Sequence, residues 1–235
     1  MQADYDRFVS LLDPDGVRAA LIDMDGTLYD SMPHHADAWM HLMRDMGIDA
    51  RREEFFLYEG STGAAIIDRM IRRQWGRPAT PAEMKDGYAV KSRYFTEMPR
   101  VEPVAGAREL VDALLSRGIV TVLVTGSGQH ALLDRLAADF PGAFPEERRV
   151  TSASVRRGKP APDPYLRGLE IAGVPASRAI AIDNAPLGTT SGHAAGIPTV
   201  GVVTGPIPEA ELAANGADIV FNSMPLCAEI LPQLL

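Results

Sequence analysis

The chain has 235 residues, a formal net charge of −8 at pH 7 and 46% hydrophobic residues. A chain of this length and apolar content can bury a full core, which excludes disordered and fibrous classes of protein. The acidic surplus offers no basic stripe to a phosphate backbone, so general nucleic-acid binding is excluded as well.

Short apolar runs alternate with helical patterns along most of the chain. The segment Ala3–Leu12 is predicted to be an amphipathic helix docked on the core. Five strands are predicted, namely Val17–Asp23, Ile119–Thr125, Ala179–Asp183, Thr199–Val203 and Asp218–Phe221. Helices are predicted over Val104–Gly118, Gln129–Phe140, Pro164–Gly173 and Pro186–Gly196. This alternation predicts an α/β fold in which helices cover both faces of a parallel sheet.

One long interval interrupts the alternation. Between Ser31 and Pro99 there is no strand-like run, and apolar residues recur at helical spacing. The two stripes are Trp39, Leu42, Met43 and Met46, and Ile66, Ile67, Met70 and Ile71. The pattern predicts a helical domain, residues 32–98, inserted into a core made of residues 1–31 and 99–235.

The start of the chain and its cysteine content bear on location. The first twenty residues carry acids where a signal peptide needs a basic start and an apolar core. The apolar runs are too short to cross a bilayer. Cys227 is the only cysteine, and it stands in an apolar stretch with no His beside it, which favours a buried thiol. We therefore expect a cytoplasmic protein that does not enter a membrane.

Two carboxylates follow the first predicted strand. Asp23 and Asp25 are two residues apart, so they project from the same side of an extended chain. Open α/β sheets bind their ligands at this end of the strands. Two carboxylates this close repel each other, and a bound cation would offset the repulsion. An Asp-x-Asp-Gly turn that only caps the strand is an alternative at this point.

The other strand ends carry matching chemistry. Thr125, Gly126 and Ser127 supply a hydroxyl and amides suited to phosphate oxygens. Lys159 stands on a loop stiffened by two prolines, where it can serve as a fixed positive charge. Asp183 and Asn184 close a third strand. Hard oxygen ligands from separate strand ends favour Mg²⁺.

Four motifs follow one another along the chain. They are Asp-Met-Asp-Gly-Thr-Leu, Thr-Gly-Ser, Gly-Lys-Pro-Ala-Pro-Asp and the acidic strand end before Pro-Leu-Gly. The chain resembles the haloacid dehalogenase superfamily of phosphotransferases, and within it the beta-phosphoglucomutase-like branch with a small helical cap. The resemblance covers residues 15–235 and implies a Rossmann-like core with the helical insert as the cap.

The resemblance also implies roles. Asp23 would attack phosphorus to form an aspartyl-phosphate, and Asp25 would act as general acid and base. Thr125, with the amides of Gly126 and Ser127, would hold the phosphoryl oxygens, and Lys159 would balance their charge. Magnesium would bind the Asp23 carboxylate, the Asp25 carbonyl oxygen and Asn184, with Asp183 reaching it directly or through water. The expected substrate contacts in the insert are His35, Gly60, Ser61 and Lys91.

The sequence supports three hypotheses of function. The first is a Mg²⁺-dependent phosphatase of a small phosphorylated metabolite, such as a sugar phosphate. The second is a sugar-phosphate mutase, which His35 favours, although the segment 59–63 lacks the arginine that grips a second phosphate in the mutase. The third is a catalytically weakened protein that binds a phosphorylated ligand, since Asn184 stands where the family usually has an acid.

A dinucleotide-binding domain is disfavoured, because the segment Thr125-Gly126-Ser127-Gly128 lacks the glycine spacing of its fingerprint. The sequence is compatible with a monomer and leaves the oligomeric state open.

Overall fold

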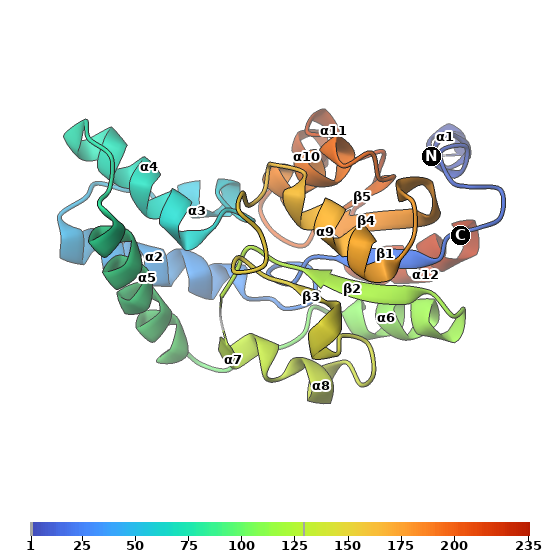
Figure 1. The fold of residues 1–235 in the computed structure, drawn as a ribbon, viewed down its shortest axis with the longest axis horizontal. Coiled ribbons are helices and arrows are strands. Elements are labelled where there is room, and N and C mark those ends of the chain that lie inside the picture. The colour runs from blue at the N-terminus through green and yellow to red at the C-terminus, as the bar shows by residue number, and fades with distance from the viewer. Residues whose placement is uncertain (1, 129) are drawn as a thin grey trace.

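A parallel sheet of six strands in the order β3-β2-β1-β4-β5-β6 forms the centre of the computed structural model, which describes residues 2–128 and 130–235 (Figure 1). The strands are β1 (Ala19–Ile22), β2 (Val120–Val124), β3 (Arg149–Val150), β4 (Ala179–Asp183), β5 (Thr199–Val202) and β6 (Ile219–Phe221). β1 pairs in parallel with β2 on one side and with β4 on the other. The chain therefore reverses its direction of travel across the sheet beside β1, which is where such sheets bind ligands.

Helices cover both faces of the sheet. They are α1 (Gln2–Val9), α6 (Ala107–Ser116), α7 (His130–Leu133), α8 (Leu136–Asp139), α9 (Asp163–Ala172), α10 (Pro186–Ala194), α11 (Glu209–Ala214) and α12 (Met224–Leu234), with short 3₁₀ turns at Glu146–Arg148 and Ala176–Arg178. The α/β fold with a parallel sheet is thus confirmed.

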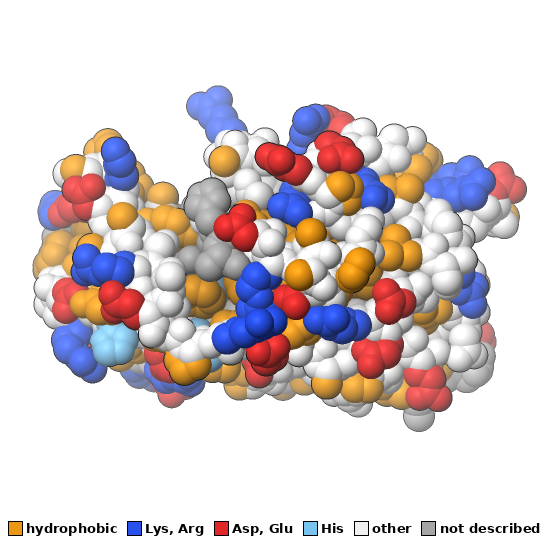
Figure 2. All heavy atoms as spheres, turned by 90° about the horizontal axis from the view of Figure 1, so that it is seen from below, with side chains coloured by type: hydrophobic (Ala, Val, Ile, Leu, Met, Phe, Trp, Pro, Cys, Tyr) orange, Lys and Arg blue, Asp and Glu red, His pale blue; other side chains and the backbone are white. Residues whose placement is uncertain are grey.

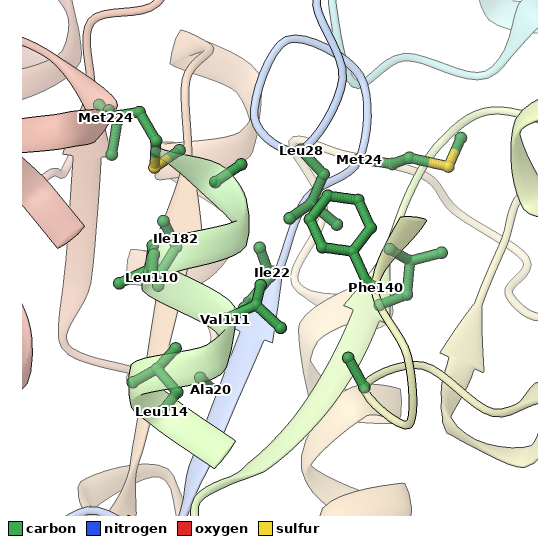
Figure 3. Close-up of a cluster of buried hydrophobic side chains, with 14 of the residues drawn as sticks. Ala20, Ile22, Met24, Leu28, Leu110, Val111, Leu114, Phe140, Ile182 and Met224 are labelled. Carbon is green, nitrogen blue, oxygen red and sulfur yellow. The ribbon is translucent and has the colours of Figure 1, made fainter. Parts of the chain in front are cut away.

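Alternation along β1 explains the two layers. Ala20 and Ile22 belong to a core that includes α6, α8 and α12, whereas Ala19 and Leu21 belong to a core that includes α9. In Figure 3 the side chains of Ile22 and Ile182 point toward Leu110 and Val111 of α6. All four residues of β1 are apolar and buried, as is typical of a strand covered by helices on both faces. The first polar residue after the strand is Asp23.

The interval without strands is helical, as expected. It holds α2 (Met32–Met46), α3 (Glu54–Leu57), α4 (Gly63–Trp75) and α5 (Pro81–Thr96), which lie together at one end of the molecule (Figure 1). Both predicted apolar stripes are buried in a separate cluster, apart from the half-buried Met46. Helix α5 begins with a capping box in which Thr80 and Glu83 satisfy each other's amides. We call residues 32–96 the helical insert.

Two expectations about the core need correction. β3 was not predicted, because a strand of two residues shows no periodicity. The single helix predicted from residue 129 to Phe140 is instead the two short helices α7 and α8; residue 129 itself lies outside the described residues. Cys227 is fully buried in α12, as the sequence predicted.

The surface carries both charges. On the face drawn in Figure 2, Lys and Arg side chains alternate with Asp and Glu without a broad field of one sign. Among the described residues, no helix combines the length and apolar character that a membrane span requires.

Candidate active site

A cavity of about 50 Å³ lies between the carboxyl ends of β1 and β2 and the helical insert. Asp23, Asp25 and Thr125 form its core side. The insert contributes His35, Glu59, Gly60, Ser61, Tyr88 and Lys91, among others. Most of the residues that the sequence singled out therefore line one cavity. Of the rest, Lys159 and Asn184 contact residues that line it, and Asp183 contacts Lys159.

Asp23 and Lys159 form the buried centre of the site. The Lys159 ammonium donates to Asp23 Oδ1 at 2.6 Å and to Asp183 Oδ2 at 2.7 Å. The other oxygen of Asp23, Oδ2, is buried and has no hydrogen-bond partner in the described part of the chain. Burial raises the pKa of Asp23, and Lys159 only partly offsets this effect. Asp23 thus has one oxygen held and one free.

Asp183 is held from three directions. Besides Lys159, the hydroxyl of Tyr165 donates to its Oδ2 at 2.7 Å, and the backbone amide of Ala185 donates to its Oδ1 at 3.1 Å. Tyr165 is fully buried in α9. No sequence pattern marks Tyr165 as a site residue, because nothing local links α9 to the end of β4.

Asp25 accepts hydrogen bonds from the segment that enters the insert. Ser31 Oγ donates to Asp25 Oδ1 at 2.7 Å, and His35 Nε2 lies 2.8 Å from the same oxygen. Thr125 Oγ1 lies 3.5 Å from Asp25 Oδ2. Burial alone raises the pKa of Asp25, but His35 and Ser31 outweigh it and lower the pKa to about 2. Asp25 is therefore ionised in this arrangement.

Lys91 extends this chain of contacts into α5. Its ammonium is in hydrogen-bond contact with His35 Nδ1, which makes that nitrogen an acceptor and leaves Nε2–H to donate to Asp25. Lys91 is 1% exposed, and burial lowers its pKa to about 7. Arg93, two residues further along α5, is exposed and lies outside the cavity lining.

The loop after β2 meets the insert closely. The amide of Ser127 donates to Thr125 Oγ1 at 2.9 Å, and the amide of Gly128 donates to the Tyr88 hydroxyl at 3.1 Å. A Cβ atom on Gly126 would stand 2.3 Å from the carbonyl oxygen of Gly60. Only glycine at this position permits the approach of insert and core.

A carboxylate of the helical insert that the sequence did not single out, Glu59, contacts the residue that follows β4. The side-chain amide of Asn184 donates to Glu59 Oε1 at 3.0 Å, while Thr27 Oγ1 donates to Asn184 Oδ1 at 2.9 Å. Glu59 is 6% exposed, and burial, with Asp23 nearby, raises its pKa well above the usual range. Gly26 has φ +80°, and a Cβ there would stand 2.2 Å from Asn184 Nδ2 and 2.5 Å from Glu59 Oε1.

The donor chemistry around Asp23 fits Mg²⁺. Carboxylate and amide oxygens of Asp23, Asp183, Asn184 and Glu59 are hard ligands, and the unpartnered Oδ2 of Asp23 is an oxygen that a cation would satisfy. The described residues nevertheless contain no group of three acids or histidines arranged to chelate a metal. The ammonium of Lys159 forms ion pairs with both Asp23 and Asp183.

Comparison with known proteins identifies the family. The model of the haloacid dehalogenase-like hydrolases matches residues 17–196 of the chain. The chain belongs to the haloacid dehalogenase-like hydrolases. Its resemblance to this family is thereby confirmed, and so is its assignment to the phosphatase and phosphotransferase enzymes.

Named phosphatases and phosphoglucomutases are among the relatives of this haloacid dehalogenase-like chain. Hexitol phosphatase A of Escherichia coli is 30% identical over 206 residues, which cover 87% of this chain and 90% of the relative. A beta-phosphoglucomutase of Mycobacterium bovis is 27% identical and covers 93% of each chain. A solved structure from Bacteroides vulgatus, provisionally assigned as a beta-phosphoglucomutase, is 40% identical with a TM-score of 0.94 and covers 100% of this chain and 98% of its own.

Proposed function

We propose that the protein is a Mg²⁺-dependent phosphohydrolase of a small phosphorylated metabolite, with Asp23 as the nucleophile. The observation that carries this proposal is the state of Asp23: Lys159 holds one carboxylate oxygen, and the other is unpartnered at the floor of the cavity. The family contains phosphatases and phosphosugar enzymes, which agrees with this chemistry.

The reaction would have two steps. In the first, a carboxylate oxygen of Asp23 forms a bond to phosphorus while the bond from phosphorus to the leaving oxygen breaks. In the second, water attacks the aspartyl-phosphate, Asp25 takes its proton, and the Asp23–phosphate bond breaks to release inorganic phosphate. Asp25 is ionised in the empty site, and the phosphoryl group beside it would raise its pKa, so that it takes up a proton from the substrate phosphate or from solvent when substrate binds. It would give this proton to the leaving oxygen in the first step, which leaves it ionised to take the proton of water in the second.

Other residues would position the phosphoryl group. Thr125, Gly126 and Ser127 line the cavity where its oxygens would lie. The Gly126 amide and the Thr125 hydroxyl would donate to them, and the Ser127 amide holds the Thr125 hydroxyl in place. The ammonium of Lys159 would balance their charge. His35, held by Lys91, would keep Asp25 in place.

The residues proposed to hold magnesium are Asp23, the backbone carbonyl of Asp25, Asn184 and Asp183, and Glu59 joins them because it contacts Asn184. The ion, when bound, would neutralise negative charge that builds up on the transferring group. Loss of the usual acid at position 184 is thus offset by an acid supplied from the insert.

The helical insert is proposed to act as a cap. It carries His35, Glu59 and Lys91, all of them buried against the core site. Closure over the cavity would exclude bulk water until substrate is in place.

The cavity favours hydrolysis and a small leaving group. A volume of about 50 Å³ holds only a few waters, so the cavity favours a small leaving group with the insert in this position. A Cβ atom on Gly63 would stand 2.0 Å from the ring of Tyr88, so no side chain that could grip a second phosphate fits there. The contact at Gly63 argues against the mutase.

The test is phosphate release from a graded set of substrates. We would compare inorganic pyrophosphate, a two-carbon phosphate, hexose phosphates and an aryl phosphate, each with Mg²⁺ and with chelator. Asp23→Asn serves as the blank. We expect Mg²⁺-dependent release that is fastest for the smallest leaving groups and absent in the blank. Isomerised hexose phosphate without free phosphate would establish the mutase, and no reaction at all would point to a binding protein.

A further inference from the structure

Asp139, the last residue of α8, is a buried carboxylate outside the cavity. It is 4% exposed, and it accepts a hydrogen bond from the Tyr29 hydroxyl at 3.0 Å on Oδ2. Arg108 Nη2 donates to Oδ1 at 3.1 Å. None of these side chains lines the cavity, so their arrangement needs another explanation.

Two more arginines converge on the same carboxylate. Arg135 Nη2 lies 2.9 Å from Asp139 Oδ2, and Arg100 Nη2 lies 3.6 Å from Oδ1. Arg135 also donates through Nη1 to the carbonyl oxygen of Val101 at 2.6 Å. One buried carboxylate thus lies among three guanidinium groups. Arg100 belongs to the segment that leaves the helical insert, and Arg135 contacts that segment at Val101.

The two linkers of the insert run side by side at this place. We call residues 29–31 the entry linker and residues 97–106 the exit linker. The amide of Asp30 donates to the Glu102 carbonyl at 3.0 Å, and the amide of Val104 donates to the Leu28 carbonyl at 2.9 Å. Tyr29 and Pro103 form an antiparallel bridge. Any rotation of the insert has to begin at this pair of linkers.

Tyr29 connects the linkers to the catalytic turn. Its carbonyl oxygen accepts from the Gly26 amide at 2.7 Å, which closes the turn that carries Asp25. Its ring is fully buried, edge-on to Phe140 with centroids 5.7 Å apart, and the Arg135 guanidinium lies 5.4 Å from its centroid. A shift of the Tyr29 side chain would therefore be transmitted to the backbone beside Asp25.

We propose that Asp139 is a positioning residue that fixes both linkers of the insert and, through Tyr29, the turn that carries Asp25. Its charge holds three guanidinium groups together. Without that charge, Arg135, whose side chain is only 23% exposed, loses its ion pair beside the exit linker, and the more exposed Arg100 and Arg108 lose the anion that draws them to the same place. The structural part stands alone, whereas its kinetic consequence rests on the proposed function.

The test compares Asp139→Asn and Tyr29→Phe with wild type by residue-resolved hydrogen exchange. Asn retains an acceptor oxygen but no charge, and Phe removes only the hydroxyl. In both variants we expect the linker amides of Asp30 and Val104 to exchange at least about ten-fold faster, with exchange in β4 unchanged. Asp218→Asn is the matched control, since Asp218 accepts a backbone amide at 2.8 Å in a part of the core away from the linkers.

The kinetic arm separates positioning from general destabilisation. A small misplacement of Asp25 should lower kcat about ten-fold while KM changes much less. Equal acceleration of exchange in the linkers and β4, or wild-type linker exchange in both variants, would overturn the proposal. Tyr29→Phe keeps the test decisive if Asp139→Asn does not fold. If wild type releases no phosphate, the proposed function fails while the exchange comparison still decides the role of Asp139.

Discussion

The side-chain amide of Asn184 on the core donates a hydrogen bond of 3.0 Å to the carboxylate of Glu59 on the helical insert. The contact joins the end of β4 to the loop before α4, 125 residues apart in sequence. It places the carboxyl group of Glu59 beside Asn184, in addition to the acid that β4 itself supplies, Asp183. The insert therefore contributes a carboxyl group to this edge of the core.

A charge exchange between these two residues tests that relationship. Glu59→Gln should weaken Mg²⁺ binding, because one carboxylate is lost, and Asn184→Asp should tighten it. The double variant Asn184→Asp/Glu59→Gln restores the original charge and should return the affinity toward wild type. Titration calorimetry with Mg²⁺ measures all three without substrate. Unchanged affinity in both single variants would exclude these residues from the metal site.

Loss of Lys159 should destabilise the fold. Lys159→Met leaves Asp23 and Asp183 buried without a compensating charge, and breaking such a pair costs about 3–5 kcal/mol. Tyr165→Phe, which removes one hydrogen bond to Asp183, should cost about 1.5–3 kcal/mol. Urea unfolding at pH 7 with chelator gives both values. A loss below 1 kcal/mol for Lys159→Met would contradict this account of the buried pair.

Lys91 should make stability depend on pH. Its pKa is about 7 in the folded protein against 10.5 as the ordinary value, so between these pH values the unfolded chain binds more protons than the folded one. The free energy of unfolding should therefore rise with pH in this window, relative to Lys91→Met, by up to about 1.4 kcal/mol per pH unit. Urea unfolding of both proteins from pH 6 to pH 9 measures it. Parallel curves would show that Lys91 has an ordinary pKa.

Closure of the insert should depend on Gly126. In Gly126→Ala the new methyl group would collide with the Gly60 carbonyl, which keeps the insert from seating on the core and should lower kcat/KM about 100-fold. Gly128→Ala is the matched control, because its Cβ would meet nothing closer than 3.5 Å. Steady-state phosphate release compares the two. Equal activity in both variants would mean that this contact is dispensable for catalysis.

The core side of the site was predictable from sequence because the carboxyl ends of parallel strands meet at one edge. Asp23 and Thr125 each follow a buried strand and Asp183 ends one, and pairing of β2 and β4 with β1 brings them together. Local patterns were enough to predict these site residues, because each of them is adjacent in sequence to the strand that positions it.

The insert side was harder to predict. Glu59 and Tyr88 reach the site only through packing of α2, α4 and α5, and no periodicity in the chain specifies which loop faces the sheet. The division of residue 129 to Phe140 into α7 and α8 likewise has no glycine or proline to signal it. Features that depend on contacts between distant segments escape a reading of local sequence.

The hydrogen-bonded pair of linkers has an architectural consequence. The chain leaves the core at Asp30 and returns to it at Glu102, and the backbone hydrogen bond between these two residues closes the gap. The core is thus continuous across the junction. The segment between the two residues can differ in length and shape without altering the register of the strands, so β1, β2 and β4 can keep their side chains in place beneath inserts of different kinds.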